Sequence, residues 1–386
     1  MSEIGILILK NESLFTNGIA QQAYFTYKVL INAGFNVDFY CCDFGYDKYD
    51  FLDIPVIYLN TNTNLDNLNI LICIGAELSS EQDLQFIKSK NISIIRQICG
   101  NEFILTQEDI IFNCHKRDFY NNNSYYDEVW LLPMYEHMKE YTETLNGIDV
   151  QIVPYVWDST IIDKFQDLNN NDIYCNYSEE SIFNKPKSIL IAEPNMSIHK
   201  TCLVPLTIIE KTFKKLHNKD LLNKVFLLCK PNTESFNNFV SKLEFVKNNK
   251  LEAYPRINLM AILGQLNELK IPIICLSHQI LNELNFLHLE LMYLGYPVIH
   301  NCGMINDIGY FYPYNTIYSA ADNLYDICTG NIKYSNKNLK DKIYRFSPDN
   351  PKNIEKYKEI MTNSINKHKI SMENKNNISE FILKTI

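Results

Sequence analysis

Short apolar runs alternate with segments of helical periodicity along almost the whole chain, and this alternation constrains the fold more than any other feature. In the first half, strands are predicted at 4–9, 36–42, 55–59, 69–75, 92–98, 128–133 and 150–154, and helices at 19–33, 80–89 and 134–145. Strands that are joined by helices form parallel sheets with helices on both faces. We therefore predict an α/β fold with a doubly wound, Rossmann-like sheet.

A second series of the same kind occupies the other half. Its strands are predicted at 188–194, 223–230, 250–254, 271–277 and 297–300, and its helices at 200–216, 258–269 and 286–294. We predict an N-terminal domain at 1–157, a polar linker or insertion at 158–186, a C-terminal domain at 187–349, and a polar helix at 350–386 that returns to the first domain. Two such sheets are expected to face a central cleft, with ligands at the carboxyl ends of the strands.

Composition narrows the class of protein. The 386 residues are 46% hydrophobic, enough for a large core, and 36 basic residues are interspersed with 45 acidic ones to give a net charge of −9. This balance argues against nucleic acid as a partner and against an anionic membrane surface. The 11 cysteines form no CxxC pair, the N-terminus lacks the pattern of a signal peptide, and no apolar run is long enough to span a bilayer. We expect reduced thiols and a cytoplasmic protein.

Three stretches combine strand, turn and helix signals: NGIAQQAYFTYKVLINAGFNVDFY at 17–40, VQIVPYVWD at 150–158 and NFLHLELMYLGYPVIHN at 285–301. They resemble segments of GT-B fold retaining glycosyltransferases. Together with CGNEF at 99–103, IAEPN at 191–195 and HKTCLVP at 199–205, their order is more closely similar to an uncharacterised family related to these enzymes. The resemblance covers roughly residues 4 to 360.

The resemblance implies an enzyme with two Rossmann-like domains. It would move a sugar, with retention, from a nucleotide-diphosphate sugar to a glycan, protein or small-molecule acceptor, and it would need no cofactor besides this donor. The chain has no Asp-x-Asp after a strand and no HExxH motif, so we expect no metal. A nucleotide-sugar epimerase or hydrolase, or a non-catalytic nucleotide-sugar-binding protein, is the alternative. The lack of GxGxxG after a first strand argues against a dinucleotide oxidoreductase.

The stretch before strand 297–300 predicts a donor site. Asn282 and Asn285 are good N-cap residues ahead of an apolar helix that begins at Phe286, so the amide groups and dipole of this helix would face a phosphate. In the resemblance, Glu290 matches a glutamate that holds the nucleotide ribose, whereas Asn282 and Asn285 replace the family's first glutamate and glycine. The alternative is an ordinary capped helix with a paired acid.

Cationic and polar residues at other strand ends of the second half extend this prediction. Lys200 is predicted to open a helix, where a cation is unfavourable unless an anion binds, and it matches a phosphate-binding lysine of the family. The family's accompanying arginine is replaced by Glu193. Lys230 is a candidate second phosphate contact, Arg256 a candidate for the base pocket, and His278 a candidate nucleotide contact. A solvated surface lysine is the alternative for Lys200.

The first half supplies the remaining candidates. Asn17 and Gly18 lie between the first strand and helix, where the backbone could approach a sugar closely or simply turn. Asn101 and Glu102 follow strand 92–98 and are expected to meet the acceptor or the donor sugar. Many relatives carry a catalytic-site histidine here, and this sequence does not. Glu12 and Glu102 are the carboxylates that could act as a base.

Overall fold

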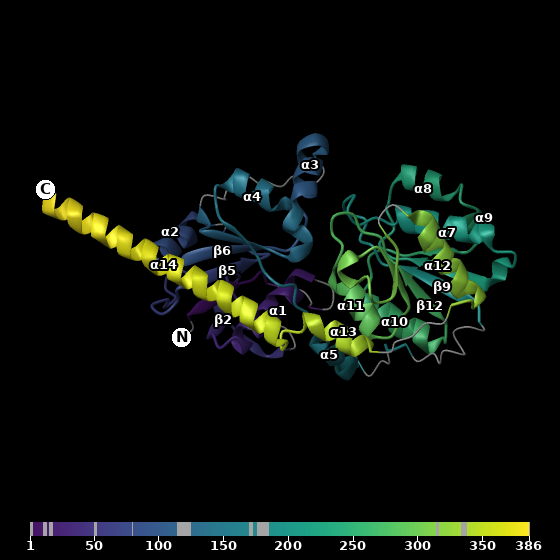
Figure 1. Ribbon diagram of the computed structural model, residues 1–386, viewed down its shortest axis with the longest axis horizontal. Coiled ribbons are helices and arrows are strands. Elements are labelled where there is room, and N and C mark those ends of the chain that lie inside the picture. Colours follow the sequence, from purple (N-terminus) through teal and green to yellow (C-terminus); the bar gives the residue numbers. More distant parts are fainter. Residues whose placement is uncertain are drawn as a thin grey trace. The chain divides into compact units, whose positions relative to one another are not determined.

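The computed structural model describes residues 3–10, 14, 18–49, 52–78, 80–113, 125–169, 173–175, 185–313, 316–332 and 338–385. Two compact units make up the chain (Figure 1). Unit 1 comprises Met1–Asp158 and Arg345–Ile386, and unit 2 comprises Ser159–Tyr344. Each unit is built on its own sheet.

An eight-stranded sheet forms the centre of unit 1. Its strands are β1 (Ile4–Leu7), β2 (Val37–Cys41), β3 (Lys48–Tyr49), β4 (Ile54–Tyr58), β5 (Ile70–Ile74), β6 (Ser93–Ile98), β7 (Glu128–Leu131) and β8 (Val150–Ile152). The order is β3-β4-β2-β1-β5-β6-β7-β8, and all pairs are parallel except β3 with β4. Ile4 of β1 lies opposite Val37 on one side and Ile70 on the other.

Helices cover both faces of this sheet. They are α1 (Gly18–Asn32), α2 (Glu81–Ser89), α3 (Glu102–Phe112), the 3-10 helix η3 (Pro133–Met138), α4 (Lys139–Asn146) and α14 (Pro351–Thr385). α1 ends before Gly34, whose φ of +91° suits a glycine after a helix, as predicted. α1 packs beside α14 (Figure 1), and α2 packs through Ile87 against an apolar layer that includes Leu71 and Cys73.

The C-terminal helix α14 is fastened to unit 1 along its first half. The Tyr357 hydroxyl donates to the main-chain oxygen of Pro154 at 2.9 Å, and its ring lies edge-on to Trp130. About two turns further, the Ser364 hydroxyl bonds the buried carboxylate of Glu128. These contacts attach the C-terminal helix to unit 1.

A six-stranded parallel sheet forms the centre of unit 2. Its strands are β9 (Lys187–Ile191), β10 (Leu222–Leu227), β11 (Leu251–Ala253), β12 (Ile273–Leu276), β13 (Val298–His300) and β14 (Tyr310–Phe311). The order is β11-β10-β9-β12-β13-β14. The chain leaves β9 toward β10 and later returns to pair β12 with the other side of β9, so the direction of winding reverses between β9 and β12.

The helices of unit 2 are α5 (Thr160–Asn169), α7 (Leu203–Lys215), α8 (Glu234–Val240), α9 (Glu244–Lys247), α10 (Leu259–Glu268), α11 (Phe286–Tyr293), α12 (Ile317–Thr329) and α13 (Leu339–Ile343), with 3-10 turns η4 (Lys219–Leu221) and η5 (Gly303–Ile305). A further 3-10 turn, η6 (Tyr344–Phe346), joins this unit to the C-terminal segment. α7 and α12 pack on one face over alternate strand residues such as Ile189, Val225 and Ile274.

The predicted α/β fold with two doubly wound, parallel sheets is confirmed. Several local expectations differ from the structure. Helices α3, α8, α9 and α12 were not anticipated, and α5 lies within the segment 158–186 that the sequence predicts as a linker. α7 begins at Leu203, so Lys200 lies in the loop before the helix and does not open it.

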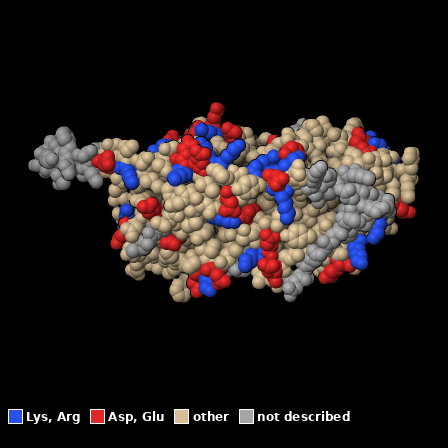
Figure 2. Space-filling model, turned by 60° about the horizontal axis from the view of Figure 1, so that its bottom comes forward, with Lys and Arg blue, Asp and Glu red and all other residues tan. Residues whose placement is uncertain are grey.

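The charge of the face drawn in Figure 2 is mixed, and none of the described helices could span a membrane. On the face shown in Figure 2, acidic and basic side chains are interspersed without a large area of one sign. Over the part of the chain that is described, no helix is both long enough and apolar enough to cross a membrane.

Candidate functional site

The carboxyl ends of β9 and β12 bring two polar loops together in unit 2. In open α/β sheets, ligands bind at the point where the winding reverses, because the loops on either side leave in opposite directions. Here that point lies between β9 and β12. The loop after β9 carries Glu193 and Lys200, and the loop after β12 carries Ser277, His278 and Gln279.

Backbone contacts hold Lys200 in place. It forms an isolated antiparallel bridge with Gln279, which joins the two loops directly. Asn195, in the left-handed region at φ +54°, donates its amide to the main-chain oxygen of Lys200 at 3.1 Å. The Asn195 side chain accepts from the amide of Cys202 at 2.7 Å. The lysine therefore belongs to a closed turn whose shape is fixed by hydrogen bonds.

Glu193 is a fully buried carboxyl group beside this lysine. The Ser277 hydroxyl donates to its Oε1 at 2.5 Å, and the Gln279 side chain donates to its Oε2 at 3.2 Å. Burial raises the pKa of Glu193 to about 7, although its hydrogen bonds and the charge of Lys200 act in the opposite direction. Burial likewise lowers the pKa of Lys200, and the negative charge of Glu193 opposes that shift.

Asn282 and Asn301 extend the polar cluster. The Asn282 side chain donates to Gln279 Oε1 at 2.6 Å. Asn301 accepts from the amide of Gln279 at 3.0 Å and donates to its main-chain oxygen at 2.7 Å. Both asparagines are buried, so they fix the loop after β12 rather than face solvent.

The predicted capping of α11 by asparagine side chains is not observed. Asn285 occupies the N-cap position with extended backbone, but its side chain makes no capping hydrogen bond, and its buried Oδ1 has no partner among the described residues. The Asn282 amide donates to Gln279. Phe286 is the half-buried first residue of the helix, and Glu290 lies one turn deeper, 7% exposed.

Three buried histidines line this region. His288 Nε2 lies 2.9 Å from the Ser277 hydroxyl, and its Nδ1 has no partner within the described part of the chain. His278 Nδ1 lies 2.9 Å from the Tyr312 hydroxyl, and His300 Nε2 lies 2.8 Å from a main-chain oxygen. Burial lowers the pKa values of His278 and His300 to about 4 and the pKa of His288 well below its ordinary value. All three imidazoles are therefore neutral at neutral pH.

Lys230 and Arg256 lie further along the same edge. Both are exposed, one after β10 and the other after β11, which are one and two strands away from β9. The Lys230 amide donates to the main-chain oxygen of Tyr254 at 3.0 Å. The structure thus brings Lys200, His278 and Asn282 into one cluster, whereas Lys230 and Arg256 stand apart from it. In the described residues no three His, Cys, Asp or Glu side chains gather as metal ligands.

In unit 1, Asn101 lies at the carboxyl end of β6 and meets a histidine. Its Oδ1 accepts from the amide of Ile104 at 3.0 Å and so caps α3, while its Nδ2 lies 3.4 Å from His137 Nε2. His137 is an exposed residue of η3, which follows the neighbouring strand β7. The loop after β6 itself carries no histidine, and the structure brings one beside it from 36 residues further along the chain.

Glu102, the other candidate of this loop, is held by Arg96. The two guanidinium nitrogens of Arg96 bond the two carboxylate oxygens of Glu102 at 2.7 and 3.2 Å. A carboxylate whose two oxygens are both engaged by a guanidinium is a poor proton acceptor. At this edge, Glu102 is thus bound through both oxygens, whereas the imidazole of His137 is exposed.

The first loop of unit 1 is described in part. Gly18 is the first residue of α1. Close by, Gly75 after β5 has φ +66°, and a Cβ there would lie 2.1 Å from the Ile19 side chain, so the loop needs glycine. Asn17 and Glu12 lie outside the described residues.

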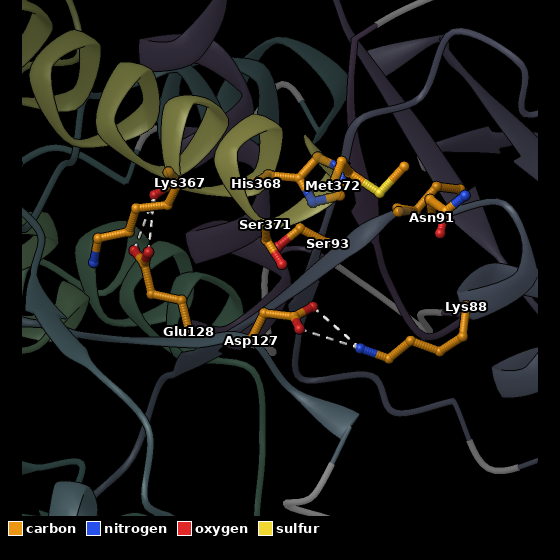
Figure 3. A pocket seen from close by; sticks show the side chains of 11 residues that line it. Lys88, Asn91, Ser93, Asp127, Glu128, Lys367, His368, Ser371 and Met372 are labelled. Carbon is orange, nitrogen blue, oxygen red and sulfur yellow. Dashed lines mark hydrogen bonds and ion pairs between the residues drawn. The ribbon is translucent and has the colours of Figure 1, made fainter. Parts of the chain in front are cut away.

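A cavity of about 240 Å³ lies at the opposite edge of the unit 1 sheet, under α14 (Figure 3). Two lysines of its wall form ion pairs, Lys88 with Asp127 and Lys367 with Asp149. Lys88 Nζ lies 3.1 Å from Asp127, and Glu128 accepts from Ser364 and from Trp130. These pairs fasten the amino ends of β6 and β7 to neighbouring helices, and the cavity is not part of the cluster at the carboxyl ends.

A family model described as "Protein of unknown function (DUF2827)" matches residues 4–361. The chain belongs to this family. No curated protein matches the sequence.

Solved structures share the fold. A glycosyltransferase from Rickettsia africae has 15% identity and a TM-score of 0.51, with 93% of this chain and 98% of that chain covered. The lipopolysaccharide outer core galactosyltransferase WaaB has 13% identity and a TM-score of 0.53, with 93% and 99% covered. An α-glucosyltransferase in complex with UDP and a DNA 13-mer has 12% identity and a TM-score of 0.55, with 89% and 95% covered. The fold of this member of the family is that of GT-B glycosyltransferases, as the sequence motifs predict.

Proposed function

We propose that the chain is a glycosyltransferase that moves a sugar from a nucleotide-diphosphate sugar to an acceptor. The observation that carries the proposal is the position of Lys200, which is fixed by backbone bonds where the winding of the unit 2 sheet reverses. The shared fold with glycosyltransferases supports it. An ammonium group that is half-buried at such a point is suited to an anionic ligand.

The chemistry gives each group of unit 2 a role. Transfer breaks the bond between the anomeric carbon and the phosphate oxygen, so negative charge grows on the departing phosphate. Lys200 would stabilise this charge, together with the amide groups at the start of α11 near Asn285. Glu290 would bind the ribose. Lys230 and Arg256, further along the edge, would reach the outer part of the nucleotide.

Unit 1 would bind the acceptor, a glycan, a protein or a small molecule. Gly18 opens the helix that follows the first strand, and Asn101 with His137 forms a polar pair at the carboxyl ends of β6 and β7. His137 would exchange a proton with the reacting hydroxyl, and Asn101 would orient the imidazole. The proposal includes transfer with retention of the anomeric configuration, independence from metal ions and a cytoplasmic location.

A panel of nucleotide sugars tests the proposal. Wild type and Lys200→Ala are incubated with UDP-, GDP- and ADP-linked hexoses, with and without a mixed acceptor pool, and nucleotide release and sugar products are measured. We expect one donor to be turned over by wild type, and Lys200→Ala to lower kcat by about 10²- to 10³-fold. Lys242→Ala, at an exposed lysine of the same unit, is the matched control.

The outcomes separate the candidate functions. Sugar transfer that needs an acceptor supports the proposal, whereas free sugar or an epimer without an acceptor identifies a hydrolase or an epimerase. Equal turnover by wild type and a folded Lys200→Ala variant removes Lys200 from the mechanism. Thermal melts of both variants show whether the fold is intact.

A further inference from the structure

A buried carboxyl group stands next to the lysine that the proposed function assigns to the donor phosphate. Glu193 follows β9, is fully buried and acts electrostatically on Lys200. A phosphate that binds Lys200 brings its negative charge toward a second negative charge, at a place that is shielded from water. Binding is strongest when one of these two charges is neutralised.

The hydrogen bonds around Glu193 suit both of its charge states. The Ser277 hydroxyl, 2.5 Å away, can donate to the carboxylate or accept from the carboxylic acid, because a hydroxyl does both. On its other side, Ser277 meets His288 Nε2 at 2.9 Å, and a neutral imidazole nitrogen donates or accepts according to its tautomer. The Gln279 amide donates to the second oxygen in either state. Glu193 can therefore gain a proton while its neighbours stay in place.

The other titratable groups around Glu193 do not exchange protons near pH 7. Burial raises the pKa values of the thiols and of the phenol and lowers the pKa values of the imidazoles, so that these groups are neutral: Cys202, Cys229, Tyr312, His278 and His288. Glu193 and Lys200 are the two groups of opposite charge that these neutral side chains surround. Burial places the pKa of Glu193 at about 7, within the working range of an intracellular enzyme.

We propose that Glu193 takes up one proton from solvent when the phosphate of the donor binds at Lys200, and that Glu193 thereby sets which phosphate charge the site accepts. The inference rests on the proposed donor site. The carboxylate and a solvent proton form a carboxylic acid, and no other bond is made or broken. The pair of Glu193 and Lys200 changes from no net charge to one positive charge, which matches the incoming anion.

Calorimetry with UDP tests this coupling. The binding enthalpy is measured at pH 8 in Tris, HEPES and PIPES, whose different ionisation enthalpies report the number of protons exchanged. We expect uptake close to one proton by wild type, and a Kd that rises about fivefold from pH 7 to pH 8. In Glu193→Gln, which keeps the shape of the side chain, uptake should vanish and the Kd should become independent of pH in this range.

Lys200→Arg is the matched variant, because a guanidinium keeps its proton throughout. The Lys200→Arg variant should still take up a proton on binding if Glu193 is the proton acceptor. If Lys200 is the proton acceptor in wild type, the variant should take up none. Binding of UDP without proton uptake, or with equal uptake in Glu193→Gln, overturns the inference and leaves the donor site intact. If Glu193→Gln does not fold, the number of protons taken up by wild type and by Lys200→Arg on binding UDP decides whether Glu193 is the proton acceptor. If wild type binds neither UDP, ADP nor GDP, the proposed function itself fails, and the inference with it.

Discussion

The side chains of Asn101 and His137 meet at the carboxyl edge of the unit 1 sheet, with Nδ2 and Nε2 3.4 Å apart. The contact exists because β6 and β7 are parallel neighbours, so the loop after one strand lies beside the turn after the other. Asn101 is fully buried and caps α3, whereas the imidazole of His137 is exposed. A rigid partner therefore holds a ring that solvent and ligands can reach.

Replacement of His137 should lower activity without lowering stability. We expect His137→Ala to reduce kcat by on the order of 10² to 10⁴ if the imidazole exchanges a proton with the acceptor hydroxyl. The thermal midpoint should hardly change, because the residue is exposed. Steady-state kinetics and a melt check this, with His217→Ala, at an exposed histidine of unit 2, as control. Full activity in His137→Ala would contradict the assignment.

The ion pair of Arg96 and Glu102 should contribute to the stability of unit 1. The two side chains are 15% and 23% exposed and bond through two nitrogens, so a double-mutant cycle with Arg96→Met and Glu102→Gln should give a coupling free energy of about 1–2 kcal/mol. Urea unfolding measures it. The exposed pair Lys48 and Asp53 is the control and should show no measurable coupling. Equal coupling in the two pairs would refute the structural role.

Ser364 should fasten α14 to the sheet. Its hydroxyl lies 3.0 and 3.1 Å from the carboxylate oxygens of Glu128, and both side chains are buried. Ser364→Ala should lower the free energy of unfolding by about 1–3 kcal/mol, since it leaves a buried carboxylate with fewer donors. Ser371→Ala, two turns further along the helix at an exposed position, should change it by less than about 0.5 kcal/mol. Comparable losses in both variants would mean that Ser364 is not the anchor.

Acid should destabilise unit 2 through its buried histidines. A histidine whose folded pKa is lowered contributes stability that is fully present above its unfolded pKa of about 6.5 and is lost as pH falls toward the folded value. For His300, with a folded pKa of about 4, the loss at pH 5 is about 2 kcal/mol. Urea unfolding at pH 7 and pH 5 should show this loss in wild type and less of it in His300→Gln.

The pKa shift of Glu193 changes stability with pH in the opposite direction, and urea unfolding over a range of pH detects this effect. Its folded pKa is raised to about 7, so its contribution is present below the unfolded value of about 4.5 and is lost as pH rises through 7. Glu193→Gln should therefore remove a decline of stability between about pH 4.5 and pH 8, which opposes the effect of the histidines where the two ranges overlap. If Glu193→Gln and His300→Gln changed the slope of stability against pH in the same direction, the assignment of these pKa shifts would be wrong.

The sheets could be predicted because buried parallel strands read as short apolar runs. β5 (Ile70–Ile74) and β9 (Lys187–Ile191) are buried at every position, and both overlap such apolar runs. α3 escaped prediction because its apolar residues do not fall on one face: Ile110, Ile111 and Phe112 are consecutive and exposed. Its one clear signal was the capping residue Asn101 after strand 92–98.

The site was harder to predict than the fold, because its contacts join distant segments. The strand-end rule found Lys200 and His278, and the capping pattern before the apolar helix found Asn282; the structure places these residues in one cluster. The expected pair of capping asparagines is not observed at the N-cap position, which Asn285 occupies without a side-chain capping bond, whereas Asn282 donates its amide to Gln279. His137 lies within an apparently ordinary helical stretch, and only the pairing of β6 with β7 brings it to Asn101.

Hydrogen–deuterium exchange with a bound nucleotide tests the central claim most directly, namely that the loops after β9 and β12 bind the donor phosphate. Backbone exchange of the full-length chain is compared with and without a saturating nucleoside diphosphate. We predict slower exchange in peptides that cover 192–202 and 277–290, and no such change in Lys200→Ala at the same nucleotide concentration. Bound nucleotide with unchanged exchange in both segments, or with protection confined to the cavity under α14, would contradict the account.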